Sequence, residues 1–151
     1  MFFSVKNPIC IFLFIGAVIL SSGCAQNLSP EYLAKASPED RTLALLKSPA
    51  VGDMYAARVD HFSNYEYGDG GAAFGALQVT EVTPQELTLH SSTAASIDSS
   101  MALSLIQKSL AEVDWDSDEQ IVILRAELLS LFYDGMILEA MRPGLKQNRN
   151  Q

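Results

Sequence analysis

An unbroken apolar run from Ile9 to Leu20 constrains this chain more than any other feature. Its length falls within the roughly 7–15 residues that form the hydrophobic region of a secretory signal peptide. A membrane-spanning helix needs about 20 apolar residues, so the run is too short to cross a bilayer. One positive side chain, Lys6, precedes the run, as is typical of such signals. We therefore expect residues 1–23 to be an address, and the fold to be built from the residues after Gly23.

Three small residues and a cysteine come directly after this run. The stretch Leu20-Ser21-Ser22-Gly23-Cys24 resembles the lipobox of bacterial lipoproteins, in which an aliphatic residue and small residues precede a lipidated cysteine. Leu20 stands one position further from the cysteine than in the usual pattern. The resemblance implies cleavage after Gly23 and attachment of a diacylglyceryl thioether to Cys24, often with an amide-linked acyl chain. Two or more acyl chains anchor a protein stably, whereas a single chain holds it only marginally.

The residues around the predicted cleavage site also bear on location. Once Cys10 leaves with the signal, Cys24 is the one remaining cysteine, and acylation accounts for a leftover thiol in an exported chain. The alternative, an ordinary thiol after an ordinary secretory signal, stays open. In Gram-negative lipoproteins an aspartate after the cysteine commonly signals inner-membrane retention, so Ala25 favours the outer membrane, facing the periplasm.

Charge and length define what remains after cleavage. Removing residues 1–23 from the 151-residue chain leaves 128 residues, and loss of Lys6 moves the formal charge from −8 to −9. This length fits one domain. We expect a lipidated tether with short helices over residues 24–48, a folded domain over 49–143 and a polar tail over 144–151. An acidic chain is a poor ligand for nucleic acid, which binds through Lys and Arg on phosphates.

Helix and strand signals alternate through the rest of the chain. Ser29-Pro30 and Ser37-Pro38 are typical helix starts, because serine caps the first turn and proline suits the first helical position. Apolar residues at every second position predict strands, and apolar residues spaced three or four positions apart predict helices. We expect helices over residues 30–36, 38–47, 100–113 and 126–133, strands over 54–62, 76–82, 86–91, 120–124 and 136–141, and loops over 63–75 and 114–119.

The order of these elements resembles an SH3-like small β-barrel over about residues 49–143. The segment Val51-Gly52-Asp53-Met54-Tyr55, the turn at Pro84 and Tyr133-Asp134-Gly135 carry the resemblance. We expect a mainly β, α+β fold with five strands and a helical insertion, in which residues 76–82 and 86–91 form a hairpin. The alternative is an open antiparallel sheet packed on helices. SH3-like barrels mostly bind ligands, so the resemblance implies binding. The hairpin residues predicted to face the core are Leu77, Val79, Leu87 and Leu89.

The loop over residues 63–75 is the first candidate for function. Its aromatic side chains offer flat contact surface at low entropic cost, and its glycines oppose a regular ladder. A lid over the core is the alternative role for these aromatics. The candidate binding residues are Tyr65, Tyr67, Asp69 and Phe74.

Two further groups of residues have the chemistry of metal or catalytic sites. Asp114, Asp116 and Asp118 have the spacing of the start of an EF-hand loop, which binds Ca²⁺ through alternating oxygens. The positions that require glycine and a bidentate acid are occupied by Glu119 and Arg125, which favours a solvated acidic connector. His61 and His90, without a third placed ligand, make a poor zinc site and no recognisable hydrolytic triad.

The sequence therefore predicts location better than activity. We expect a lipid-anchored cell-envelope lipoprotein that acts as a binding module, without a cofactor and without enzymatic activity. Its partners would be the membrane, through Cys24, and another envelope protein. The alternatives are an immunity or inhibitor lipoprotein directed against an envelope-acting toxin or enzyme, and, less favoured, a hydrolase.

Overall fold

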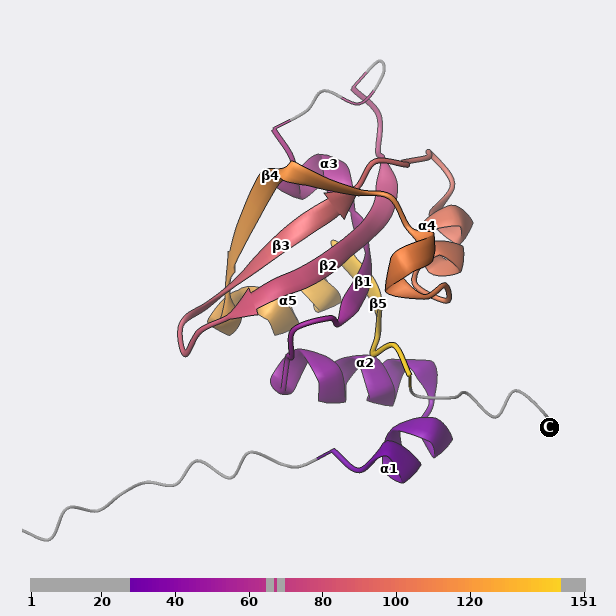
Figure 1. Cartoon of the computed structure of the whole chain (residues 1–151), viewed down its shortest axis with the longest axis vertical. Coiled ribbons are helices and arrows are strands. Elements are labelled where there is room, and N and C mark those ends of the chain that lie inside the picture. Colours follow the sequence, from indigo (N-terminus) through magenta and orange to yellow (C-terminus); the bar gives the residue numbers. More distant parts are fainter. Residues whose placement is uncertain (1–27, 65–66, 68–69, 145–151) are drawn as a thin grey trace, which may run out of the picture.

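A computed structural model describes residues 28–64, 67 and 70–144 of the chain (Figure 1). The predicted signal peptide, the lipidation residue Cys24, the loop residues Tyr65 and Asp69, and residues 145–151 lie outside the described residues. Among the helices that the structure describes, none combines the length and the apolar character that crossing a membrane requires.

The described strands form one open, five-stranded antiparallel sheet. Its order is β4-β3-β2-β1-β5, so β4 and β5 occupy opposite edges (Figure 1). The expected hairpin is confirmed, because β2 pairs with β3 across the Pro84 turn. The alternative of an open sheet packed on helices is confirmed, and the closed SH3-like barrel is not formed. The strands are β1 (Met54–Arg58), β2 (Phe74–Val82), β3 (Glu86–Ser92), β4 (Trp115–Leu124) and β5 (Ile137–Met141).

Short helices cover this sheet at positions that the sequence largely predicted. Ser29 and Ser37 each accept a hydrogen bond from a backbone amide of the first turn, at 3.2 and 3.1 Å, and so begin the first two helices as expected. Gly135 adopts a φ of +73° after the last helix, a conformation that glycine adopts without penalty. The helices are α1 (Pro30–Lys35), α2 (Pro38–Lys47), α3 (Val59–Phe62), α4 (Ser99–Leu105) and α5 (Leu128–Tyr133), with single 3₁₀ turns η1 (Leu110–Glu112) and η2 (Arg125–Glu127).

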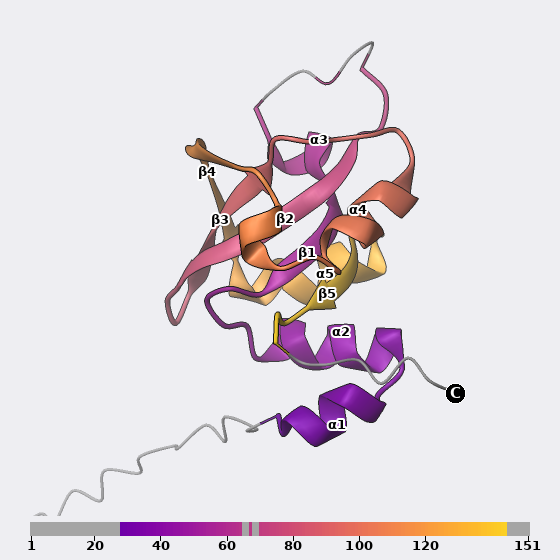
Figure 2. The ribbon, with the colours of Figure 1, turned by 45° about the vertical axis from the view of Figure 1, so that its right-hand side comes forward.

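The main hydrophobic core lies between one face of the sheet and helices α1, α2 and α5. All four hairpin residues predicted to face inward, Leu77, Val79, Leu87 and Leu89, are wholly buried there. Leu45 and Leu46 of α2 pack into the same cluster, so α2 is part of the folded unit rather than of a free tether. Figure 2 shows α1 and α2 stacked at one end of the molecule, with α3 and the start of β2 at the other.

A second, smaller cluster covers the opposite face of β1 and β2. Met54 and Ala56 of β1 pack there against Ala102 and Ile106 of the α4 segment. Residues on both faces of β1 are therefore buried, whereas the alternation of apolar and polar residues over 54–60 is typical of a strand with one exposed face. The pattern failed because alanine is small enough to accept a helix on either face of the strand.

Most predicted elements differ in their bounds by a few residues, and three differ in kind or extent. The strand expected over residues 54–62 ends at Arg58, where α3 begins, because the Asp60 carboxylate accepts hydrogen bonds from Arg58 and from the Ala73 amide. The helix expected over 100–113 ends at Leu105 and restarts as η1, where Ser109 donates to Glu112. The loop expected over 114–119 belongs mostly to β4.

One edge of the sheet is covered by a helix. The amide of Ala140 in β5 donates to the Thr42 hydroxyl of α2, at 3.0 Å. Arg41 of α2 donates to the Glu139 carboxylate of β5, at 2.8 Å. These contacts satisfy polar groups at an edge that would otherwise offer a template for strand addition.

A buried ion pair ties the ends of three segments together. The wholly buried Asp53 carboxylate accepts two hydrogen bonds from Arg142, at 2.6 and 2.9 Å. It also accepts the Ala50 amide at 2.9 Å, and Arg142 donates to the Ser48 carbonyl at 3.0 Å. The end of α2, the start of β1 and the residue after β5 therefore share one network. Burial raises the pKa of the Asp53 carboxyl, against the opposing effect of its bonds to Arg142 and Ala50.

We predict that Arg142→Met will destabilise the fold by about 3–5 kcal/mol at neutral pH, because it leaves the Asp53 carboxylate buried without its partner. The lost partner raises the folded-state pKa of Asp53 further above its unfolded value. The folded variant then holds a proton that the unfolded chain releases, so stability is lost as pH rises through the folded pKa. Urea unfolding should show the smallest deficit near about pH 4 and the largest near neutrality.

Arg125→Met is the matched control, because the Arg125 guanidinium donates to the Thr83 carbonyl rather than to a carboxylate. It should cost about 1 kcal/mol, with a deficit nearly independent of pH. Equal pH profiles for the two variants would contradict the role given to Asp53.

Candidate functional site

A groove opens at the end of the sheet where β2 begins. It has a volume of about 330 Å³ and lies between the segment before β2 and the segment before α4. The amide of Phe74 donates to the Ser96 carbonyl at 2.7 Å, and the amide of Ser96 donates to the Phe74 carbonyl at 2.9 Å, which joins the two walls. The described lining residues are Tyr67, Gly71, Ala72, Ala73, Ala95, Ser96 and Ile97.

Hydrogen bonds from the strand ends hold the first wall in place. The Ala73 amide donates to the Asp60 carboxylate at 3.0 Å, and Arg58 donates to the same carboxylate at 2.6 Å. Burial by itself would raise the pKa of Asp60, but the bonds from Arg58 and Ala73 outweigh it and keep the pKa below its ordinary value. The carboxylate therefore stays ionised near neutral pH and continues to bind the groove wall.

Close packing at Gly75 fixes how the two walls approach each other. A Cβ at this position would lie 2.9 Å from the Ser92 hydroxyl oxygen, 3.0 Å from Val59 and 3.1 Å from the Ala94 carbonyl oxygen. The Ser92 hydroxyl itself donates to that Ala94 carbonyl and accepts the Ala76 amide. Only glycine leaves room for the second wall to cross β2 at this point.

A carboxylate from β4 holds the start of the loop on the other side. Between the pairs Leu89–Ile121 and Ser91–Asp116, β4 has more residues than β3, and Glu119 lies in the resulting bulge. Its nearly buried carboxylate accepts hydrogen bonds from the hydroxyls of Ser63 and Ser91, at 2.5 and 2.8 Å, and from the Asn64 amide, at 3.1 Å. Glu119 thus fastens the segment after α3 to the sheet.

The groove has the character of a contact surface for an apolar group. None of its described lining residues is charged, and backbone polar groups of the two walls are already paired at the Phe74–Ser96 bridge. Ile97 is 87 % exposed at its rim, which is a large apolar side chain left in water. Such a surface suits an aliphatic or aromatic side chain of a partner better than a charged metabolite.

The structure separates the loop residues that the sequence grouped together. Tyr67 lines the groove and packs against the main core cluster. Phe74 packs instead against the second cluster, on the opposite face of the sheet. Tyr65 and Asp69 lie outside the described residues. Of the four candidates, Tyr67 alone is placed in the groove, where it serves the core as well as the surface.

The metal and histidine candidates do not come together. Among the described residues, no group of three or more His, Cys, Asp or Glu side chains is placed to hold a metal ion. Asp116 turns its carboxylate toward its own backbone and accepts the amides of Asp118 and Glu119, at 3.0 and 3.3 Å. His61 stacks edge-on against Phe62 in α3, while His90 lies within β3 opposite Gln78.

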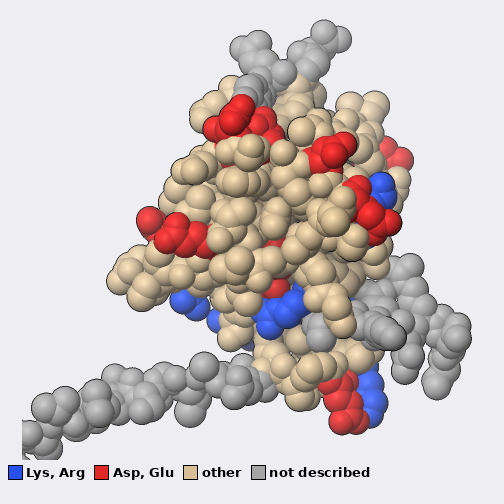
Figure 3. All heavy atoms as spheres, in the orientation of Figure 1, with Lys and Arg blue, Asp and Glu red and all other residues tan. Residues whose placement is uncertain are grey.

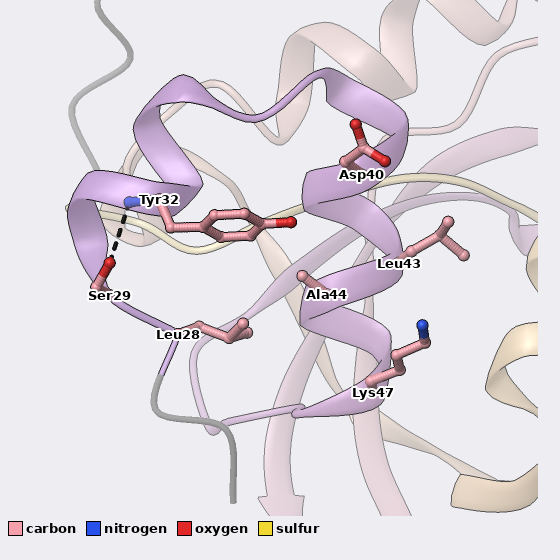
Figure 4. Close-up of a pocket in the computed structure, with 7 residues that line it drawn as sticks. All are labelled: Leu28, Ser29, Tyr32, Asp40, Leu43, Ala44 and Lys47. Atoms are coloured by element: carbon pink, nitrogen blue, oxygen red, sulfur yellow. Dashed lines mark hydrogen bonds between the residues drawn. The ribbon is translucent and has the colours of Figure 1, made fainter.

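A second hollow, of about 480 Å³, lies between α1 and α2 (Figure 4). Figure 4 shows the ring of Tyr32 reaching from α1 toward α2, with Leu28 and Ala44 below it. Asp40 and Lys47 stand at opposite ends of the α2 wall. Leu28, the first described residue, is one of the residues that line this hollow.

The sequence did not single out Ile97 or Glu119 as site residues. The available signal for Ile97 was its position as an isolated isoleucine among small and polar residues over 91–100. The sequence predicts a solvated connector at Glu119 because nothing local reveals its partners, which are 28, 55 and 56 positions away in the chain.

A scan of the chain against protein-family models finds no match, and searches of curated proteins and of solved structures find none either.

We predict that Glu119→Ala will destabilise the fold by about 1–3 kcal/mol, because it leaves the Ser91 hydroxyl and the Asn64 amide without their acceptor. Hydrogen exchange should show the Asn64 amide losing protection to a greater degree than amides of β2 and β3. Asp118→Ala is the control, because its exposed side chain should cost under about 0.5 kcal/mol. Unchanged protection of Asn64 in Glu119→Ala would refute the role of this carboxylate.

Proposed function

We propose that the protein is a lipid-anchored lipoprotein of the bacterial cell envelope that binds another envelope protein and catalyses no reaction. The groove rimmed by Ile97 is the observation that carries the binding role, because it combines an apolar lining with a large exposed apolar side chain. The resemblance of residues 20–24 to a lipobox supports the anchor. Ala25 favours the outer membrane, facing the periplasm, in a Gram-negative cell.

The arrangement of the fold supports this combination of anchor and groove. Cys24 precedes the first described residue, Leu28, by four positions, so the anchor would hold the α1 end of the molecule near the bilayer. Figures 1 and 2 agree that α1 lies at one end, with α3 and the start of β2 at the other. The groove at the start of β2 would then face away from the membrane, where a partner protein is accessible.

The charge of the molecule fits the same orientation. Figure 3 shows acidic groups distributed over the visible surface of the sheet side, with fewer basic groups. The formal charge of −9 expected after cleavage opposes close adhesion of the domain to anionic lipid, because like charges repel near the surface. The anchor would hold the domain near the bilayer without pressing the groove against it.

The anchor is tested by Cys24→Ser. We expect the variant to incorporate no labelled fatty acid and to remain a largely uncleaved precursor, because acylation requires the thiol and must come before cleavage by a lipoprotein signal peptidase. Gly16→Ala, a small change inside the apolar run, is the control and should keep full labelling. Equal labelling of the wild type and Cys24→Ser would exclude the anchor while leaving the binding role of the groove untouched.

The groove is tested at its most exposed position. We predict that a photoreactive amino acid at position 97 will cross-link to a defined envelope protein in intact cells, and that Ile97→Asp will weaken binding to that protein by about 2 kcal/mol or more. The melting temperature should not change, because the Ile97 side chain is exposed. Tyr67→Ala is a weaker test, since Tyr67 also packs on the core.

Position 51 provides the matched control. Val51 is another aliphatic side chain, 65 % exposed, in the turn where the Gly52 amide donates to the Val79 carbonyl, at the end of β2 far from the groove. A photoreactive amino acid at position 51 should not cross-link to that envelope protein, and Val51→Asp should not weaken binding to it. If positions 51 and 97 capture the same proteins equally, the groove is not the binding site.

A further inference from the structure

The outer edge of β4 is not paired with any described strand. In the sheet order β4 is terminal, and among the described strands it pairs with β3 alone. The opposite edge differs, because α2 covers β5 and its Thr42 hydroxyl accepts the Ala140 amide. In the part of the chain that the structure describes, a helix therefore covers one edge, and no strand pairs with the other.

The register shows which groups this edge presents. The Arg125 amide donates to the Gln85 carbonyl at 2.8 Å, directly after the pair Leu124–Glu86. Opposed residues in an antiparallel pair alternate between hydrogen-bonded and non-hydrogen-bonded positions. Leu124 and Val122 are therefore at non-hydrogen-bonded positions toward β3, and their amides and carbonyls point outward from the sheet.

The side chains of the same two residues are also exposed. Val122 is 57 % and Leu124 47 % exposed, on the face of the sheet opposite to the main core, while Ile121 and Ile123 are buried in that core. The free edge thus offers two outward amides, two outward carbonyls and two apolar side chains. A strand added here would continue the ladder and cover both side chains.

Charge selects the partner for this edge. β4 contains three acidic residues and no lysine or arginine. Glu119 is turned inward to its hydroxyl partners, which leaves Asp116 and exposed Asp118 on the strand. The exposed Glu86 lies opposite Leu124, and exposed Glu127 comes shortly after the strand. A second copy of this acidic chain would bring like charges to the edge at Asp116 and Asp118, whereas a basic segment would bring opposite charges.

We propose that the outer edge of β4 binds an extended, basic segment of a partner protein as a sixth strand. Main-chain hydrogen bonds to Val122 and Leu124 supply the ladder, and lysine or arginine side chains of the segment pair with Asp118 and its acidic neighbours. This surface is separate from the Ile97 groove and does not depend on the lipid anchor. The acidic residues that would repel a second copy are the ones that would attract the basic segment.

The test uses a fluorescein-labelled peptide of four Lys-Val repeats, capped at both ends, and the full-length protein in detergent. Anisotropy should show binding that weakens as salt rises, because the attraction between charges is screened. The peptide of four Glu-Val repeats should not bind. A Lys-Val peptide that is N-methylated at alternate residues keeps its charge but lacks the donors and should bind about ten-fold more weakly or worse.

Val122→Pro tests the protein side of the ladder. Proline removes the outward amide of Val122 without removing a hydrogen bond to β3, and edge strands tolerate it at such positions. This variant should bind the Lys-Val peptide about ten-fold more weakly or worse than the wild type. Val122→Thr keeps the amide, so its affinity for the peptide should stay within about three-fold of the wild type. Asp118→Asn should weaken binding and reduce its salt dependence.

Three results would overturn the proposal. Equal binding of the methylated and unmethylated peptides would show that charge alone attracts them. Unchanged affinity in a folded Val122→Pro would place the peptide elsewhere. If the wild type sediments as a dimer and Val122→Pro sediments as a monomer, a second copy of the chain occupies this edge. If Val122→Pro does not fold, the comparison of the methylated and unmethylated peptides on the wild type still decides the question.

Discussion

The buried pair of Asp53 and Arg142 is the interaction on which the arrangement of this fold depends. It joins the end of α2, the start of β1 and the residue after β5, and β1 and β5 are neighbours in the sheet. A carboxylate with no exposure is costly to bury, and its cost is offset here by two bonds from Arg142 and one from the Ala50 amide. With this network in place, α2 lies along β5 and the Thr42 hydroxyl meets the Ala140 amide. The sheet stays open because a helix, rather than β4, occupies its β5 edge.

The open sheet gives the molecule two kinds of surface. At the end where β2 begins, two segments joined by the Phe74–Ser96 bridge enclose an apolar groove, and Gly75 permits their close approach. Along β4, main-chain groups point outward beside acidic side chains. We propose that the groove binds an apolar side chain and that the edge binds an extended segment with basic side chains. The two proposed binding surfaces differ in chemistry, because the groove is apolar and the edge is flanked by acidic side chains.

Glu119 and Asp60 have the same role at the two ends of the segment that joins α3 to β2. Each carboxylate accepts hydrogen bonds from a segment that has no ladder of its own, Glu119 from Ser63 and Asn64, and Asp60 from Ala73. Charged acceptors form stronger hydrogen bonds than neutral ones, so a few such bonds position a segment that lacks regular structure. The acidic composition of the chain therefore contributes to the construction of the groove as well as to its surface charge.

The sequence by itself determined the local features of this protein. The serine caps of α1 and α2, the hairpin at Pro84, the inward set of Leu77, Val79, Leu87 and Leu89, and the turn at Gly135 depend on neighbours in the chain and on periodicity, so they could be predicted. Only the tertiary structure decided the rest. Residues 54–62 divide into a strand and a helix because the Asp60 carboxylate accepts a hydrogen bond from the Ala73 amide. The Glu119 side chain points inward because its carboxylate accepts hydrogen bonds from the Ser63 and Ser91 hydroxyls. The closure of the sheet, the burial of both faces of β1 and the position of Ile97 likewise depend on contacts between distant segments. A pattern of neighbouring residues contains no information about such partners, because their energy arises only when the chain is folded.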